Sequence, residues 1–185
     1  MKRLFSFVCV AMLAAAASAQ ITWNTKGGIG VATCYGSEID GLKSHIVGKI
    51  GAGIEKPLSS NISLMPSLEV AWKGTKVEDF ATLDLIYLQV PVMVAYRLNL
   101  SDSWNTTFKV GPYFAYAVYD KFKVDGFGEV EGEEANKFDA GLDVGIDFEY
   151  HKFVFGVEGE MGFCKLYDSA NIKNLAFYAT VGWKF

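Results

Sequence analysis

The strongest constraint on this chain is the strict alternation of its last twelve residues, 174–185, which read NLAFYATVGWKF. Apolar residues, three of them aromatic, stand at every second position from Leu175 to Phe185, and smaller or more polar residues stand between them. Successive side chains of a β-strand leave opposite faces, whereas a helix repeats every 3.6 residues. This segment is therefore predicted to be a strand with one aromatic, apolar face that ends at the C-terminal phenylalanine.

The same period of two recurs in seven further segments, which predicts eight strands in total. These segments are residues 23–35, 44–55, 62–73, 86–98, 104–118, 138–150 and 153–163. Short turns are expected at residues 56–61, 99–103 and 150–152. Longer polar connections are expected at residues 37–43, 74–82, 120–137 and 166–173. Short turns on one side and long loops on the other are typical of an up-and-down antiparallel barrel that crosses a membrane.

The N-terminus has the pattern of an export signal. Lys2 and Arg3 precede an apolar run, residues 4–16, and the small residues Ala17-Ser18-Ala19 follow it. This order predicts a cleaved signal peptide at residues 1–19 and a single barrel domain at residues 20–185. The apolar run is too short to span the ~30 Å of hydrocarbon in a bilayer.

The composition narrows the class of protein further. Half of the chain is hydrophobic (51%) and 15% is aromatic, yet no second long apolar run follows the signal. A transmembrane barrel disperses its apolar residues in this way, one in two along each strand. The net charge of −4 argues against a nucleic-acid partner. We therefore expect an all-β, eight-stranded barrel in the outer membrane, with both termini in the periplasm because the strand number is even.

Alternation alone does not decide which face points outward, since a soluble lipocalin-like ligand-binding barrel in the periplasm would hold its apolar face inside. Two features favour the membrane alternative: glycines concentrate on the polar face, and aromatic residues of the apolar face concentrate near strand ends. A narrow lumen has room for few large side chains, and aromatic residues prefer the two membrane interfaces. The expected interface aromatics are Trp23, Trp72, Trp104, Tyr150, Trp183 and Phe185.

The charged residues on the polar face are the feature of the sequence that bears most directly on chemistry inside the barrel. The predicted lumen network comprises Lys49, Glu69, Arg97, Lys109, Asp143, Asp147, Glu158 and Glu160. Ions away from bulk water need partners, so we expect the late carboxylates, Asp143 among them, to pair with Arg97 and Lys109. Full pairing predicts a closed lumen, and unpaired charges would instead predict a narrow cation-selective pore.

The sequence contains few residue patterns that could support catalysis. His45 and His151 fall at opposite ends of the predicted barrel, so they share neither a metal nor a catalytic triad. We expect no enzyme activity, no cofactor and no metal site.

Cys34 and Cys164 both fall near the outer end of the lumen. They are expected to lie about 9–10 Å apart across two strand spacings, beyond the ~7 Å that suits a disulfide. Whether they form a bridge stays open at this point.

Three segments together resemble a known family. Residues 87–97 (YLQVPVMVAYR), 109–113 (KVGPY) and 138–142 (FDAGL) are similar to the PorT-like outer-membrane β-barrel family, which is common in Bacteroidota. The resemblance covers residues 21–185 and implies an integral outer-membrane barrel without shared catalytic residues. We accordingly expect a structural or surface-interaction role through the outer loops, chiefly residues 120–137. The expected partners are membrane lipid, the barrel-assembly machinery acting on the C-terminal strand, and a surface ligand or protein.

Overall fold

The structure is a computed structural model that describes residues 21–37, 42–77, 81–124, 128–129, 136–167 and 171–185. The eight long strands are β1 (Thr22–Gly36), β3 (His45–Pro57), β4 (Ile62–Val77), β5 (Ala81–Asn99), β6 (Trp104–Val124), β8 (Phe138–Tyr150), β9 (Phe153–Gly162) and β10 (Ile172–Lys184). Two short strands, β2 (Leu42–Lys43) and β7 (Gly128–Glu129), extend the connections. The predicted signal peptide, residues 1–19, lies outside the described residues.

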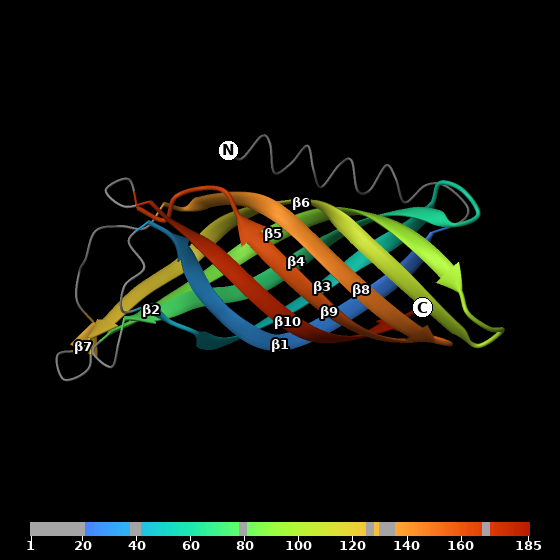
Figure 1. Cartoon of the computed structure of the whole chain (residues 1–185), viewed down its shortest axis with the longest axis horizontal. Helices are drawn as coiled ribbons and strands as arrows, with labels where there is room; N and C mark the ends of the chain where they lie inside the picture. The colour runs from blue at the N-terminus through green and yellow to red at the C-terminus, as the bar shows by residue number, and fades with distance from the viewer. Residues whose placement is uncertain (1–20, 38–41, 78–80, 125–127, 130–135, 168–170) are drawn as a thin grey trace.

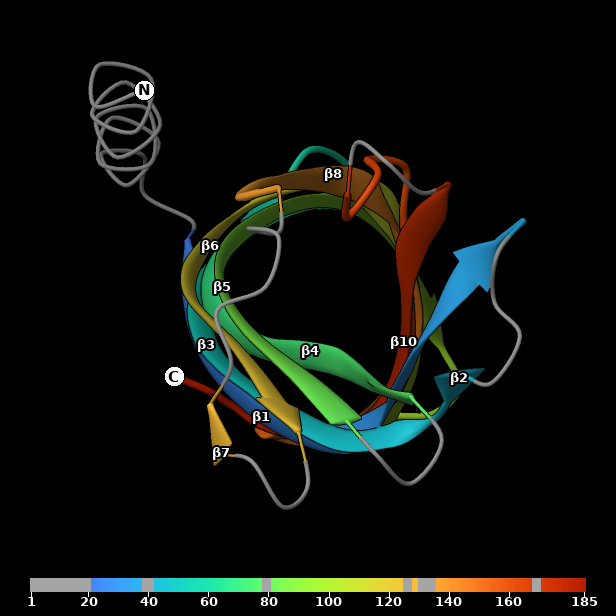
Figure 2. The same ribbon diagram turned by 90° about the vertical axis from the view of Figure 1, so that its left-hand side faces the viewer.

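The eight long strands close into a single barrel. Each pairs antiparallel with its neighbours in the order β1-β3-β4-β5-β6-β8-β9-β10, and β10 pairs back onto β1. Figure 2 looks along the barrel from one end and shows this closed ring. The all-β, eight-stranded, up-and-down prediction is confirmed. Among the described residues, no helix is long and apolar enough to cross a membrane.

The two ends of the barrel differ. Residues 58–61, 100–103 and 151–152 connect strands at one end, which we call the short-turn end. His151 adopts a left-handed backbone (φ 53°) in the tightest of these turns. Asn24 pairs with Lys184, so the first and last strands meet at this end (Figure 1). The opposite end, which carries β2, β7 and the other connections, is called the long-loop end.

Two predicted connections were wrong, because β4, β5 and β6 run further than the apolar alternation suggested. Residues 74–82 and 120–137 were expected to be loops, but backbone pairing continues to Val77↔Ala81 and Ala81↔Val124. A transmembrane strand needs about 9–11 residues, whereas β6 has 21. Beyond the membrane a strand needs only a backbone partner. Backbone pairing therefore continues past the last residue of the alternating apolar pattern.

The apolar face of the wall points outward. Ile29 is 66% exposed, Val144 48% and Phe155 47%. Inward side chains alternate with them and are buried: Asp143 is 0% and Glu158 2% exposed. The glycines of the polar face make room for these charges, since a Cβ on Gly145 would lie 3.0 Å from Glu158 Cγ and 3.1 Å from Lys109 Cε. A lipocalin-like barrel has the reverse arrangement, so that alternative is excluded.

Candidate functional site

The middle of the lumen holds a layer of buried ion pairs that we call the central cluster. Its members are Lys26, Lys49, Lys73, Lys109, Glu69, Asp147, Glu158 and Glu160. They come from six strands (β1, β3, β4, β6, β8 and β9) at positions where the polar face points inward. The cluster is therefore assembled only when the barrel closes.

Lys49 lies among three carboxylates. Its Nζ is 2.9 Å from Glu160 Oε1 and 3.5 Å from Glu69 Oε2, and it also pairs with Glu158. Carboxylate oxygens of these three glutamates lie within 4.8 Å of one another, a spacing that would suit a metal ion. The ammonium of Lys49 already binds all three carboxylates, so the positive charge that a metal would bring is supplied by the chain itself.

The other lysines complete the pairing. Lys26 Nζ lies 2.9 Å from Glu69 and 2.8 Å from Glu158. Lys109 Nζ lies 2.6 Å from Asp147 and also contacts Glu158. Lys73 Nζ lies 2.7 Å from Glu160 and 4.1 Å above the ring of Tyr113. A buried ion is tolerated when it is paired and hydrogen-bonded. Lys26, Lys49 and Lys109 donate hydrogen bonds to glutamates of the cluster, and Lys73 is held by its ion pair with Glu160.

A second group of ion pairs, the short-turn cluster, lies nearer the short turns. Arg97 lies 2.7 Å from Glu55 and 3.3 Å from Glu149, and Lys184 lies 2.7 and 2.6 Å from the same two carboxylates. Thr107 donates a hydrogen bond to Glu149. Arg97 was expected to pair with the late carboxylates, and it does reach Glu149. The expected pairing of Arg97 with Asp147, Glu158 or Glu160 is wrong. Arg97 stands close to the end of β5, so its side chain reaches only the carboxylates at the same height.

Asp143 differs from the other residues of the predicted network. Neither of its carboxylate oxygens has a hydrogen-bond partner, and the described residues provide no ion pair for it. Its neighbours across the strands are Gly111 and Glu160. The expected pairing of Asp143 with Arg97 or Lys109 is therefore wrong, because both cations are engaged elsewhere.

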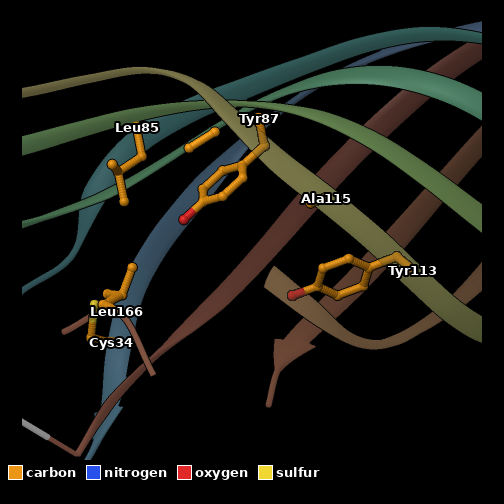
Figure 3. Packing of buried hydrophobic residues seen from close by; sticks show 7 residues of the cluster. Cys34, Leu85, Tyr87, Tyr113, Ala115 and Leu166 are labelled. Atoms are coloured by element: carbon orange, nitrogen blue, oxygen red, sulfur yellow. The ribbon is translucent and has the colours of Figure 1, made fainter. Parts of the chain in front are cut away.

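At the long-loop end the lumen changes from charged to apolar. The mouth cluster consists of Cys34, Leu85, Tyr87, Tyr113, Ala115, Ala117 and Leu166. Leu166 belongs to the connection between β9 and β10, and its side chain packs against Cys34 inside the barrel (Figure 3). Asp139 lies beneath this cluster, where it accepts hydrogen bonds from Tyr113 (2.9 Å) and Asn174 (3.1 Å). The sequence did not reveal this cluster, because Leu166 lies in a connection, where no alternating pattern marks the residues that point inward.

The two cysteines left open by the sequence are both free thiols. Cys34 is buried in the mouth cluster, and Cys164 is half-buried in the β9–β10 connection.

Between the central and short-turn clusters lies a cavity of about 40 Å³, whose polar lining includes Lys109, Asp147 and Thr180. One water needs about 10–15 Å³, so this cavity has room for a few water molecules.

The histidines lie at opposite ends, as predicted. His45 Nε2 is 3.3 Å from Asp84 Oδ1, which also accepts a hydrogen bond from Trp72 (3.2 Å) on the outer face near the long-loop end. His151 stands in a short turn, where its ring packs on Tyr150. The structure therefore brings no second histidine to either one.

All six expected interface aromatics point outward, with exposed fractions from 36% to 67%. Near the short-turn end the rings contact one another: Trp104 and Tyr150 lie 4.8 Å apart, and Phe153 and Trp183 lie 4.5 Å apart. Trp72 stands towards the other end. Aromatic rings at two heights around an apolar band match the two interfaces of a bilayer. These features define the class: an antiparallel barrel whose outer wall faces lipid.

Comparison with protein families agrees with this class. The family described as outer membrane protein beta-barrel domain matches residues 16–168, and the chain belongs to that family. The protein is therefore an integral outer-membrane barrel, and membrane lipid contacts its outer face. No curated protein matches the sequence.

Solved structures with the same fold are distant in sequence. The chain is similar to Ail, the attachment invasion locus protein of Yersinia pestis, with 16% identity, 90% of this chain and 100% of that chain covered, and a TM-score of 0.51. It is similar to Neisserial surface protein A, with 12% identity, 90% of this chain and 100% of that chain covered, and a TM-score of 0.55. It is also similar to the outer membrane enzyme PagL, with 11% identity, 86% of this chain and 98% of that chain covered, and a TM-score of 0.56. At these identities the likeness concerns the fold alone.

Proposed function

We propose that this protein has a closed lumen and acts through its long-loop end, in a structural or surface-interaction role. The observation that carries the proposal is the pairing of buried charges across the lumen together with the packing of Leu166 into its mouth. An open pore would need unpaired charges and a continuous path of water. Side chains commonly fill the interior of an eight-stranded barrel, which supports the same conclusion.

In this proposal the long-loop end faces the cell exterior and both termini face the periplasm. Long loops outside and short turns inside are the usual asymmetry of such barrels. The aromatic strand β10, which is followed by Phe185, is then accessible to the barrel-assembly machinery. Within the family, we propose that the chain is a PorT-like barrel, because residues 87–97, 109–113 and 138–142 resemble that group.

The chemistry of the surface partner follows from charge. Ail has been crystallised with sucrose octasulfate, a heparin analogue. The longest connection of the present chain instead contains the acidic run 125–134, DGFGEVEGEE, whose structure lies largely outside the described residues. Like charges across an interface are unfavourable, so we propose a partner surface that is basic rather than sulfated.

We also propose that the protein is not an enzyme. Hydrolysis by a nucleophile and a base needs both side chains within hydrogen-bond reach. The two histidines, the natural candidates for the base, lie at opposite ends of the barrel: His45 lies beside Asp84 and Trp72 on the outer wall, and His151 packs on Tyr150 in a short turn.

Two measurements test the proposal. In planar bilayers the purified protein should give no steady conductance; a stable, cation-selective current would establish the pore alternative instead.

Proteoliposomes should bind polylysine-coated beads better than heparin-coated beads. A variant with Glu131→Gln, Glu133→Gln and Glu134→Gln should lose that preference, whereas Asp102→Asn in an exposed short turn should keep it. Equal binding by both variants would contradict a role for the acidic connection.

A further inference from the structure

The charges of the lumen balance almost completely. In the central cluster four lysines meet four carboxylates, and in the short-turn cluster Arg97 and Lys184 meet Glu55 and Glu149. Asp139 stands apart from both clusters, but a tyrosine hydroxyl and an asparagine amide donate hydrogen bonds to it. Among the described lumen residues, Asp143 is the carboxyl group that has neither a cation nor a hydrogen-bond donor.

The surroundings of Asp143 make an ionised form costly. The residue is 0% exposed. On one side β6 offers only Gly111, and on the other side β9 offers Glu160, with Glu158 nearby. The cations that act on it from further across the lumen are Lys26 of β1 and Lys49 of β3, which are already bound to Glu69, Glu158 and Glu160. Tyr178 of β10 also interacts with Asp143, and its ring lies against Lys49.

We propose that Asp143 is a proton-binding site, which holds a proton at neutral pH and thereby keeps the charge balance of the central cluster undisturbed. A buried carboxyl group without a partner takes up a proton because an isolated charge in a low dielectric costs far more. A metal ion is a poor substitute, since it needs several oxygen ligands and lysines already hold Glu158 and Glu160. Loss of the proton would add an unpaired negative charge beside Glu160 and loosen the central cluster.

Infrared spectroscopy of the protein in lipid bilayers tests this site directly. At neutral pH the unmodified protein should show the carbonyl stretch of a protonated carboxyl group. Isotope-labelled aspartate should shift this band, which assigns it to aspartate even without a variant. Asp143→Asn should abolish the band, whereas Asp139→Asn and Asp147→Asn should retain it. A spectrum without the band, or a band that survives Asp143→Asn, would overturn the proposal.

Unfolding measurements give a second test. Asp143→Asn should unfold at the same urea concentration as the unmodified protein at neutral pH and should resist alkaline pH better. Asp147→Asn should unfold at a lower concentration, because it removes a partner of Lys109. If Asp143 were ionised and bound to Lys26 and Lys49, Asp143→Asn would itself destabilise the barrel at neutral pH, and the proposal would fail. The inference rests on the closed lumen proposed above. Conductance tests that closure separately, so a failure of one proposal can be distinguished from a failure of the other.

Discussion

The two faces of the barrel wall are built from one alternating sequence and obey opposite rules. Outward residues such as Val144 and Val157 are apolar and half exposed, while their inward neighbours, such as Asp143 and Glu158, are charged and buried. Lipid replaces water on the outer side, so apolar exposure there carries no cost. On the inner side space is limited, and charges persist because they bind one another. The middle of the lumen is therefore polar, and the stability of this layer should depend on charge pairing more than on apolar packing.

The largest effect is expected where one cation serves several carboxylates on the inner face. Lys49→Met should destabilise the barrel by about 3–5 kcal/mol, since it leaves buried carboxylates short of a partner. Urea unfolding in lipid vesicles, followed by the change of gel mobility on heating, measures this loss. Lys152→Met in an exposed turn is the matched control and should change little. Adding Glu69→Gln to Lys49→Met should recover part of the loss, because Lys26 still has Glu158.

The outer face is tested by placing a charge in it. Val144→Arg should cost about 2–4 kcal/mol if position 144 lies near the middle of the bilayer. The same unfolding assay applies, and reduced assembly into membranes is the expected companion result. Val144→Leu keeps the apolar character and should be tolerated. If arginine were tolerated as well as leucine, this part of the wall would not contact hydrocarbon.

The mouth cluster distinguishes the two ends of the inner face. Leu166→Ala should destabilise the protein by about 2 kcal/mol, near the lower end of the range for buried leucine, because neighbouring residues of the mouth can partly relax. Leu100→Ala removes the same atoms from a side chain that is 65% exposed and should be nearly neutral. Equal effects of the two substitutions would show that Leu166 does not seal the mouth in the membrane.

The smallest effect is expected in the short-turn cluster. The Arg97 side chain is 30% exposed, and Lys184 contacts the same two carboxylates. Arg97→Ala should therefore cost only about 1 kcal/mol, as for a partly solvated ion pair. The double variant Arg97→Ala with Lys184→Met should cost clearly more than the sum of the single changes. Simple additivity would indicate that the two cations do not compensate for each other.

Much of this architecture could be predicted from residues in sequence order. A period of two defines strands locally, so the eight long strands and the inward direction of Lys49, Asp147 and Glu158 followed directly. The ends of β5 and β6 did not follow, because an extended hairpin beyond the membrane depends on backbone pairing rather than on apolar side chains. Leu166 was also missed, since one apolar residue in a connection has no periodicity.

What the sequence determined by itself was the direction of each side chain and the class of the barrel, because both depend on neighbours along the chain. Which charge meets which was decided only by the tertiary structure. Arg97 and Glu55 are 42 residues apart in the chain, and Lys49 and Glu160 are 111 apart. Their heights in the lumen depend on strand register and barrel closure, and a short-range ion pair forms only between groups at the same height. For the same reason only the closed barrel reveals that Asp143 has no partner.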